Sequence, residues 1–528
     1  MKQKILIGGA WPYANGSLHI GHVAGLLPGD VIARYHRAIG NDVYYVSGSD
    51  CHGTPVTIRA RQEGRTAEEI SSQYHREFCR CFEWLGFSYD VYGKTSDELH
   101  KEFVSSFHKK LYESEYVYEK ASPQSFCSHC NQFLPDRYVE GKCPVCGGEA
   151  RGDQCDACGT VLDTERLLEP RCMICGSTPE LRESKHLYLR VTGLRDQLEK
   201  LLVTHPNWRK NAIAMTERYL KEGLRDRALT RDLDWGIDVP YKGYDKKKIY
   251  IWAENVLGYL SMSKEAARLR GESFEELWGE GARHYYVHAK DNIPFHTLIL
   301  PSLLIAQGGG SHLPDDIISN EYLTLEGRKI STSKNHAIWV KDIIGQYNPD
   351  AFRYFMIANG PEKRDTDFTL HEFTKSCNSE LAGAYGNFAN RTFVFLHKYY
   401  ESSVTKGNIE SDVKDKITDT FDMAGRLINQ GALKEALEYI FQLVRFSNKY
   451  FDSRAPWITR TQNQPDCENT LYNCIQLAGN LGILLAPFLP FSSEKILSWL
   501  GLETAWKIQY TQPGYRIPET EILFSKIE

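Results

Sequence analysis

The chain has 528 residues, of which 42% are hydrophobic and 25% charged. This composition is typical of globular proteins, and the length predicts about three to four domains. No run of about 18 apolar residues occurs, so we expect no transmembrane helix. The net charge of −5 gives no global sign of nucleic-acid binding but leaves room for a local basic face.

The N-terminal part predicts strands and helices of an α/β fold. The apolar run 5–7 before Gly8 predicts a buried parallel strand. A helix is expected to open at 16–19 with Ser17 as its N-cap. Residues 42–48 predict a second strand that delivers Asp50 at its carboxyl end, where ligands gather in open α/β sheets.

The segments that follow include two amphipathic helices, 66–84 and 97–117. The α/β pattern resumes with strands at 248–252 and 284–288, so the fold is split by an insertion at about 119–180.

The last part of the chain is different in character. A polar loop covers 327–334, and from about 371 only helical periodicity remains, which predicts an α-helical bundle.

The insertion carries eight cysteines in four Cys-x-x-Cys pairs. They are Cys127/Cys130, Cys143/Cys146, Cys155/Cys158 and Cys172/Cys175. Two such pairs close one tetrahedral zinc site, so the sequence predicts two structural zinc ions with no ligand position open for catalysis. A redox role is the weaker alternative, because no thioredoxin-like context surrounds the pairs. The spacing allows adjacent pairing, 127/130 with 143/146, or nested pairing, 127/130 with 172/175.

The other six cysteines show no framework spacing, which indicates a reducing cytoplasm.

His19 and His22 are three residues apart at a helix start and therefore share one face. The backbone N–H groups and the helix dipole at that end attract phosphate, and Gly21 lets a base or ribose approach the backbone. Two ordinary surface histidines are the alternative, and a bare H-x-x-H pattern would favour it.

The segment 12–16 followed by His-Ile-Gly-His resembles the first signature of class I aminoacyl-tRNA synthetases, and more narrowly the methionyl-tRNA synthetase family. Further matches follow in order along nearly the whole chain. They are 50–55, Trp252 with Gly258 and Tyr259, 290–296, 329–333, 387–391 and Pro456 with Trp457. The chain is thereby identified as a member of that family.

The resemblance implies an ATP site. Its residues would be Gly21, His19, His22, Lys290, Asp291, Lys329, Ser331, Thr332 and Ser333. The family has a second lysine where this chain has Thr332, so we infer that Lys329 and Lys334 share the electrostatic role with His19 and His22 as the catalytic set.

The resemblance also implies a methionine pocket. An aromatic lining suits this substrate, because sulfur favours aromatic neighbours. Its residues would be Trp11, Tyr13, Asp50, Trp252, Tyr259, Phe295 and His296, with Asp50 holding the substrate ammonium. Trp252 has a competing interpretation as a core residue of a buried strand. Asn255 and Val256 depart from the small residue and proline of one bacterial branch, which affects the shape of the pocket more than its substrate.

For the helical part, the resemblance implies that Asn387, Arg391 and Trp457 read the tRNA anticodon, by stacking and base-edge hydrogen bonds. Without the resemblance, Trp457 would be interpreted as core. The nested cysteine pairing is also preferred on family grounds, since some members lose the outer pairs together.

The expected fold is a Rossmann-type parallel-sheet α/β catalytic domain, split by a zinc-knuckle insertion and followed by an all-α anticodon-binding bundle. The expected ranges are 1–118 and 229–322 for the two catalytic halves, 119–228 for the insertion, 323–370 for a linker domain and 371–528 for the bundle.

The implied activity is methionine–tRNA ligation: ATP with Mg²⁺ activates L-methionine to methionyl-adenylate, which then charges tRNA(Met). A cytoplasmic monomer is expected, with room for a separate tRNA-binding partner in trans. A sister synthetase for a branched amino acid or cysteine is one rival, although branched-chain enzymes need a large editing insertion. A non-catalytic zinc-dependent RNA-binding paralogue is the other, although it should have lost His19, His22 or Asp50.

Overall fold

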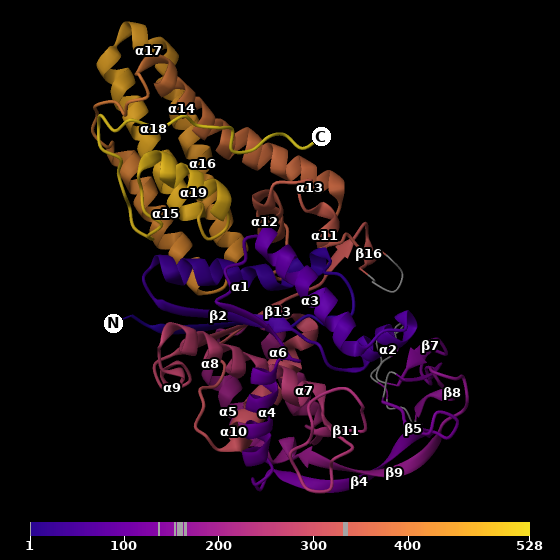
Figure 1. Cartoon of the computed structure of the whole chain (residues 1–528). Helices are drawn as coiled ribbons and strands as arrows, with labels where there is room; N and C mark the ends of the chain where they lie inside the picture. Colours follow the sequence, from indigo (N-terminus) through magenta and orange to yellow (C-terminus); the bar gives the residue numbers. More distant parts are fainter. Residues whose placement is uncertain (1, 136–137, 153–154, 156–161, 163–165, 331–335) are drawn as a thin grey trace.

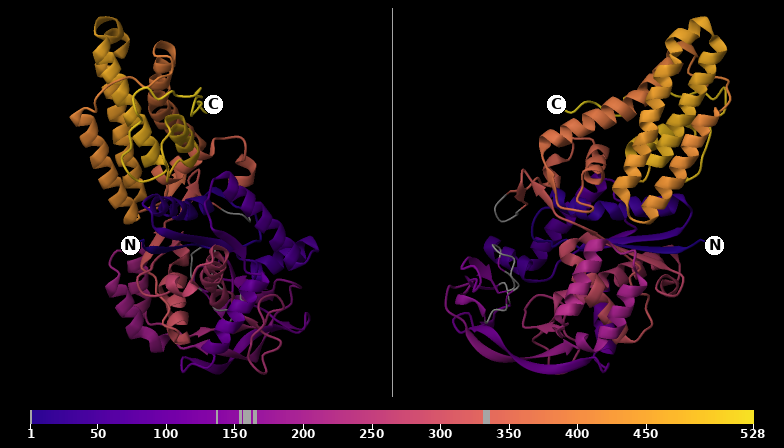
Figure 2. Two further views of the ribbon diagram at one scale, coloured as in Figure 1. Left: turned by 60° about the vertical axis from the view of Figure 1, so that its left-hand side comes forward. Right: turned by 180° about the vertical axis from the view of Figure 1, so that it is seen from behind.

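The computed structural model describes residues 2–135, 138–152, 155, 162, 166–330 and 336–528 (Figure 1). A helical bundle lies at one end of the molecule, a central sheet at its middle and the cysteine-rich insertion at the far end, as the rotated views in Figure 2 also show. None of the described helices combines the length and apolarity that crossing a bilayer requires.

The central sheet has five parallel strands in the order β14-β13-β1-β2-β3. The strands are β1 (Lys4–Gly9), β2 (Asp42–Ser49), β3 (Val91–Lys94), β13 (Arg283–Ala289) and β14 (Asp316–Asn320). The predicted strands 5–7, 42–48 and 284–288 are therefore confirmed. Because β1 lies between β2 and β13, the sheet joins segments from both sides of the insertion, and their carboxyl ends meet at one edge.

Helix α1 (Ile20–Ala38) packs on β13 and β2. Its N-cap is His19, so the prediction of Ser17 as N-cap is wrong. The cause lies in the backbone on either side: the Leu18 carbonyl accepts the Val340 N–H at 2.8 Å and the Ile20 N–H donates to the Ile338 carbonyl at 3.1 Å. Residues 18–20 are thereby paired with a distant segment, and the helix begins only after that pairing.

The other helices around the sheet largely follow the amphipathic pattern. They are α2 (Thr54–Glu63), α3 (Ala67–Trp84), α4 (Glu98–Leu111), α5 (Arg195–Thr204), α6 (Lys210–Glu222), α8 (Gly258–Arg270), α9 (Phe274–Leu277) and α10 (Leu300–Gln307). The predicted helix 66–84 is confirmed, with Thr66 and Glu69 forming a capping box. The predicted helix 97–117 ends earlier, at Leu111, because the chain turns there toward the insertion.

The predicted strand 248–252 is wrong in extent. Only β12 (Lys248–Ile249) is extended, and it pairs antiparallel with β11 (Thr230–Arg231) outside the central sheet. The Ala253 N–H donates to the Tyr250 carbonyl at 2.8 Å, which closes the first turn of the short helix α7 (Ile251–Glu254). Trp252 therefore lies on a helix and not on a buried strand.

The insertion is carried on two long antiparallel strands, β4 (Val117–Cys127) and β9 (Glu180–Leu189). Its shorter strands are β5 (Gln132–Phe133), β6 (Val139–Lys142), β7 (Glu149–Arg151), β8 (Leu168–Cys172) and β10 (Arg227–Ala228). A small buried cluster of cysteines with Tyr138, Val139 and Ala150 holds its tip together.

Beyond the central sheet, β15 (Leu323–Leu325) pairs with β16 (Arg328–Lys329) and with β17 (Thr366–Phe368). The bundle and its approach consist of helices. They are α11 (Val340–Ile343), α12 (Pro349–Ala358), α13 (Leu370–Ser376), a π-helical segment (Cys377–Gly386), α14 (Asn387–Tyr399), α15 (Ser411–Asn429), α16 (Leu433–Arg454), α17 (Pro456–Gln462), α18 (Gln464–Leu485) and α19 (Pro490–Leu500). The helical prediction is confirmed up to Leu500. The remaining tail has no helix and packs back with Ile517 and Phe524 buried.

Arg353 of α12 is completely buried and joins three parts of the molecule. Its guanidinium donates to the Asp30 carboxylate of α1 at 2.7 Å, to the Leu85 carbonyl after α3 at 3.0 Å and to the Phe488 carbonyl before α19 at 2.8 Å. Burial alone would raise the pKa of Asp30, but the adjacent Arg34 and Arg353 lower it to about 2. One ion pair thus fixes the bundle against the catalytic sheet.

Replacing Arg353 with methionine should lower the thermal unfolding midpoint, because Asp30 then stays buried with one cation fewer. Breaking a buried pair from one side typically costs about 3–5 kcal/mol. Arg34→Met is the comparison variant: Arg34 contacts the same carboxylate, but its side chain is 27% exposed, so water can replace part of the lost contact and a smaller shift is expected. Scanning calorimetry measures both, and equal small shifts would contradict the account.

Candidate active site

The loops after β1 and β2 meet at the carboxyl edge of the sheet. Tyr13 and Asp50 form an isolated parallel bridge. The Ala14 N–H donates to the Asp50 carbonyl at 2.8 Å, and the Asp50 N–H donates to the Pro12 carbonyl at 2.9 Å. This backbone pairing brings together two residues that the sequence assigned to the same pocket.

Asp50 is almost completely buried. Its Oδ2 accepts a hydrogen bond from the Asn255 side-chain amide at 2.8 Å, and its Oδ1 accepts the His52 backbone N–H at 3.3 Å. Burial raises the pKa of Asp50 well above its ordinary range, and the charge of Glu254 raises it further against the two hydrogen bonds. A cation that enters this site would oppose that rise, because it favours the ionised carboxylate.

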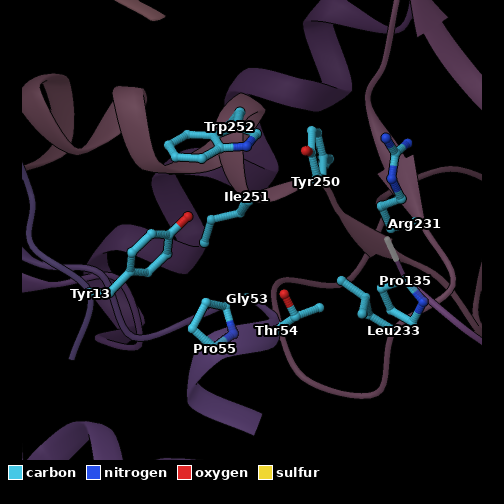
Figure 3. Close-up of a pocket in the computed structure, with 10 residues that line it drawn as sticks. All are labelled: Tyr13, Gly53, Thr54, Pro55, Pro135, Arg231, Leu233, Tyr250, Ile251 and Trp252. Carbon is cyan, nitrogen blue, oxygen red and sulfur yellow. The ribbon is translucent and has the colours of Figure 1, made fainter. Parts of the chain in front are cut away.

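A pocket opens beside Asp50, and Figure 3 shows its lining. The lining residues are Tyr13, Gly53, Thr54, Pro55, Pro135, Arg231, Leu233, Tyr250, Ile251 and Trp252. Trp252 stacks on Phe295 with ring centroids 3.8 Å apart, and Tyr13 meets Trp252 edge-on at 6.1 Å. Of the predicted pocket residues, the structure thus brings Tyr13, Trp252 and Phe295 into one aromatic group.

Trp11, Tyr259 and His296 lie differently, in the buried core next to the pocket. Trp11 packs so closely between Gly48 and Gly258 that a Cβ atom at either glycine would collide with its ring. The Tyr259 hydroxyl and His296 Nε2 are hydrogen-bonded at 2.8 Å. Among the described residues, none of these three lines the pocket of Figure 3.

Several lining residues carried no signal in the sequence. Pro135 comes from the insertion and Arg231 from β11, where its guanidinium lies 4.1 Å from the centre of the Tyr250 ring. Their position depends on how the insertion folds back over the sheet, which no local pattern reveals. Tyr250 and Ile251 were assigned to a strand instead.

His19 and His22 lie together at the start of α1, as predicted. Their rings stack with centroids 3.8 Å apart, and the His19 backbone N–H donates to His22 Nδ1 at 3.0 Å. Burial lowers the pKa of His19 to about 2, with His22 lowering it further, and burial lowers the pKa of His22 to about 4. Both imidazoles are therefore neutral near pH 7, and each offers a ring N–H as a donor.

The base of the lysine loop lies close to these histidines. A Cβ atom at Gly21 would lie 3.4 Å from the Ile330 side chain, while Lys329 on β16 is exposed. Ser331, Thr332, Ser333 and Lys334 lie outside the described residues.

Lys290 and Asp291 follow β13 at the same edge. The Lys290 ammonium pairs with Glu321 at 2.8 Å and with Asp365 at 2.7 Å. Burial raises the pKa of Asp291, and the charge of Lys329 opposes that rise. Lys290 thus already has two anionic partners in this structure.

The cysteines gather in two groups. Sγ atoms of Cys127, Cys130, Cys172 and Cys175 all lie within 4.8 Å of one another, as do those of Cys143, Cys146 and Cys155. Cys158 lies outside the described residues. The nested pairing is confirmed and the adjacent pairing is wrong, because the folded insertion brings Cys127 to 3.5 Å from Cys175.

The sulfur spacing in the first group fits a metal ion. Cys130 and Cys172 are 3.9 Å apart, and tetrahedral Zn–S bonds of about 2.3 Å place sulfurs about 3.8 Å apart. These residues could therefore hold a zinc ion with little movement.

The predicted anticodon residues lie on the bundle. Asn387 and Arg391 share α14, and Trp457 on α17 is 48% exposed, so its interpretation as core is wrong. The Arg391 guanidinium lies 5.9 Å from the Trp457 ring and pairs with Asp452 at 2.7 Å. The structure brings an exposed indole and a cation together on one surface.

Comparisons with known proteins agree with this arrangement. Residues 5–393 match the family model described as tRNA synthetases class I (M), so the chain belongs to the class I tRNA synthetases. Residues 402–528 match the anticodon binding domain of methionyl tRNA ligase.

Individual relatives indicate one family within the class I tRNA synthetases. The chain is 53% identical to methionine–tRNA ligase 1 of Alkaliphilus oremlandii and 53% identical to methionine–tRNA ligase of Bacillus cereus (strain B4264), covering 99% of this chain and 97% of each relative. Among solved structures, Mycobacterium tuberculosis methionyl-tRNA synthetase bound by methionyl-adenylate has the same fold, with a TM-score of 0.82, 21% identity, and coverage of 99% of this chain and 100% of that one.

Proposed function

We propose that this protein is a methionine–tRNA ligase, which activates L-methionine with ATP and transfers it to tRNA(Met). The observation that carries the proposal is the placement of buried Asp50 beside an aromatic pocket at the sheet edge. The 53% identity to methionine–tRNA ligases over nearly the whole chain supports the same activity.

In the methionine site, the Asp50 carboxylate pairs with the substrate ammonium. Tyr13, Trp252 and Phe295 offer aromatic surfaces to the thioether, which favours such neighbours. Trp11, Tyr259 and His296 support the pocket from the adjoining core. This division of roles follows from the ring contacts that join Tyr13, Trp252 and Phe295, and from the burial of the other three residues in the core.

ATP would lie at the start of α1. The neutral His19 and His22 donate N–H groups to phosphate oxygens, and Gly21 leaves room for the nucleoside. Lys329 and Lys334 stabilise the charge that develops on the α-phosphate and pyrophosphate, with Mg²⁺ accompanying ATP. Asp291 and the loop hydroxyls of Ser331, Thr332 and Ser333 complete the set, together with Lys290.

Catalysis then depends on how the protein positions methionine, ATP and the tRNA end. The methionine carboxylate attacks the α-phosphorus and pyrophosphate leaves. The terminal ribose hydroxyl of tRNA then attacks the methionyl carbonyl of the adenylate, and AMP leaves. No side chain becomes covalently attached to substrate. The protein contributes orientation and charge stabilisation.

The remaining roles follow the division proposed from the sequence. Asn387, Arg391 and Trp457 read the anticodon on the bundle, 371–528, while 323–370 links it to the catalytic halves 1–118 and 229–322. The insertion, 119–228, holds two structural zinc ions. We infer a cytoplasmic monomer that admits a tRNA-binding partner in trans.

The test is ATP–pyrophosphate exchange with each of the twenty amino acids. Methionine should drive exchange best, because Asp50 and the aromatic pocket together suit a long apolar thioether with an ammonium. Faster exchange with isoleucine, leucine, valine or cysteine would identify a sister synthetase instead. Absence of exchange with every amino acid would favour the non-catalytic RNA-binding alternative.

Metal analysis of the purified protein tests the insertion. About two zinc ions per chain are expected from eight thiolates. Cys130→Ser should remove one of them and Cys146→Ser the other, because these residues belong to different groups. A wild-type protein with one zinc or none would show that the double site is wrong.

A further inference from the structure

Four buried polar side chains form one network behind the pocket. Asp50 is 1% exposed, His52 2%, Glu254 0% and Asn255 7%. Glu254 Oε1 is hydrogen-bonded to His52 Nδ1, and Asn255 is hydrogen-bonded to Asp50. Two carboxylates thus share a site from which water is excluded.

This arrangement favours the protonated, neutral form of Asp50. A buried carboxylate near a second one tends to take up a proton, and both burial and the charge of Glu254 raise the pKa of Asp50. The imidazole of His52 is hydrogen-bonded to Glu254 and not to Asp50. A neutral Asp50 would lose most of its attraction for an ammonium group.

Asn255 is placed to oppose that tendency. Its amide N–H lies 2.8 Å from Asp50 Oδ2, a short distance for a donor to a carboxylate. Among the described residues, it is the only side chain that donates a hydrogen bond to the Asp50 carboxylate, whose other donor is the His52 backbone N–H at 3.3 Å. The preceding residue, Glu254, is hydrogen-bonded to His52. Two consecutive residues thus provide the hydrogen-bond partners of His52 and of Asp50.

We propose that Asn255 is a positioning residue for the substrate ammonium, acting by holding the Asp50 carboxylate ionised and in one orientation. This inference rests on the proposed function, because it assigns the ammonium of methionine to Asp50. It gives a specific task to a residue at which the chain departs from the small side chain expected in one bacterial branch of the family. The amide fixes Oδ2 and leaves lone pairs of the carboxylate for the ligand.

Two half-substrates separate this role from a loss of packing. 3-(Methylsulfanyl)propylamine keeps the side chain and the ammonium of methionine, and 4-(methylsulfanyl)butanoate keeps the side chain and the carboxylate. Each is measured as a competitive inhibitor of methionine-dependent pyrophosphate exchange. Only the first requires an ionised, oriented Asp50.

In the Asn255→Ala variant, KM for methionine should rise about tenfold to a hundredfold, the usual effect of losing a hydrogen bond to a charged group. The inhibition constant of the amine should rise by a similar factor, and kcat should change by less than about threefold. The inhibition constant of the butanoate should stay within about twofold or fall. Asn255→Leu, which keeps a side chain of similar size but has no hydrogen to donate, should repeat the pattern if the alanine variant does not fold.

Val256→Ala is the matched control, because Val256 is the next residue, is buried and has no polar side-chain group. It should affect the two half-substrates alike. Equal weakening of both inhibitors by the Asn255 variants, or an unchanged KM for methionine, would overturn the inference. A wild-type enzyme without methionine-dependent exchange would instead contradict the proposed function itself.

Discussion

A buried carboxylate stays charged only if donors or a cation accompany it, and the architecture around Asp50 follows from that constraint. The parallel pairing of β1 and β2 brings the loop with Tyr13 against the loop with Asp50. Helix α7 and the turn after it then place Asn255 within hydrogen-bonding distance of the carboxylate. Each element positions a donor or an apolar wall, and a substrate ammonium would supply the missing positive charge.

At the proposed phosphate end of the site, the buried side chains are neutral instead of charged. His19 and His22 are kept neutral by burial, so positive charge there comes from the helix start and from lysines. Lys329 is exposed on the short strand β16. Its ammonium group is therefore hydrated in the free protein and is not buried before a phosphate binds. In the proposed mechanism, the site therefore keeps a fixed anion for the amino acid and brings cations to the nucleotide.

Arg353 connects this site to the surface that carries Trp457. It donates hydrogen bonds to α1, to the segment after α3 and to a carbonyl before α19, and so joins the bundle to the helices that cover the sheet. The orientation of the bundle sets where an anticodon bound to it would direct the rest of a tRNA. A buried ion pair holds two elements together well, because its partners are costly to separate.

Local patterns predicted what depends on neighbouring residues: the strands β1, β2 and β13, helix α3 and the helical bundle. They failed where distant segments decide. Residues 338–340 delay the start of α1. The strand prediction for Trp252 failed for a local reason, because a turn at Tyr250 places Trp252 on a helix. The burial of Arg353 and the pocket positions of Pro135 and Arg231 depend on segments far apart in sequence, so no periodicity encodes them.

The resemblance to a family implied the proposed roles of His19, Asp50 and Trp457, which the residues alone left open. It did not reveal the hydrogen bond between Asn255 and Asp50, because that contact belongs to a departure from the commoner pattern.

Proton release on methionine binding, measured by titration calorimetry in buffers of different ionisation enthalpy, tests the central claim about Asp50 most directly. In the free protein its pKa is raised by burial and by the charge of Glu254, so the carboxyl takes up a proton at a higher pH than an exposed aspartate does. The bound ammonium favours the ionised carboxylate and lowers that pKa, so binding should release protons, and more of them as the pH falls toward the ordinary carboxyl range. Asp50→Asn should abolish this release. Binding of methionine to the wild-type protein without proton exchange, or with proton uptake, would contradict the account.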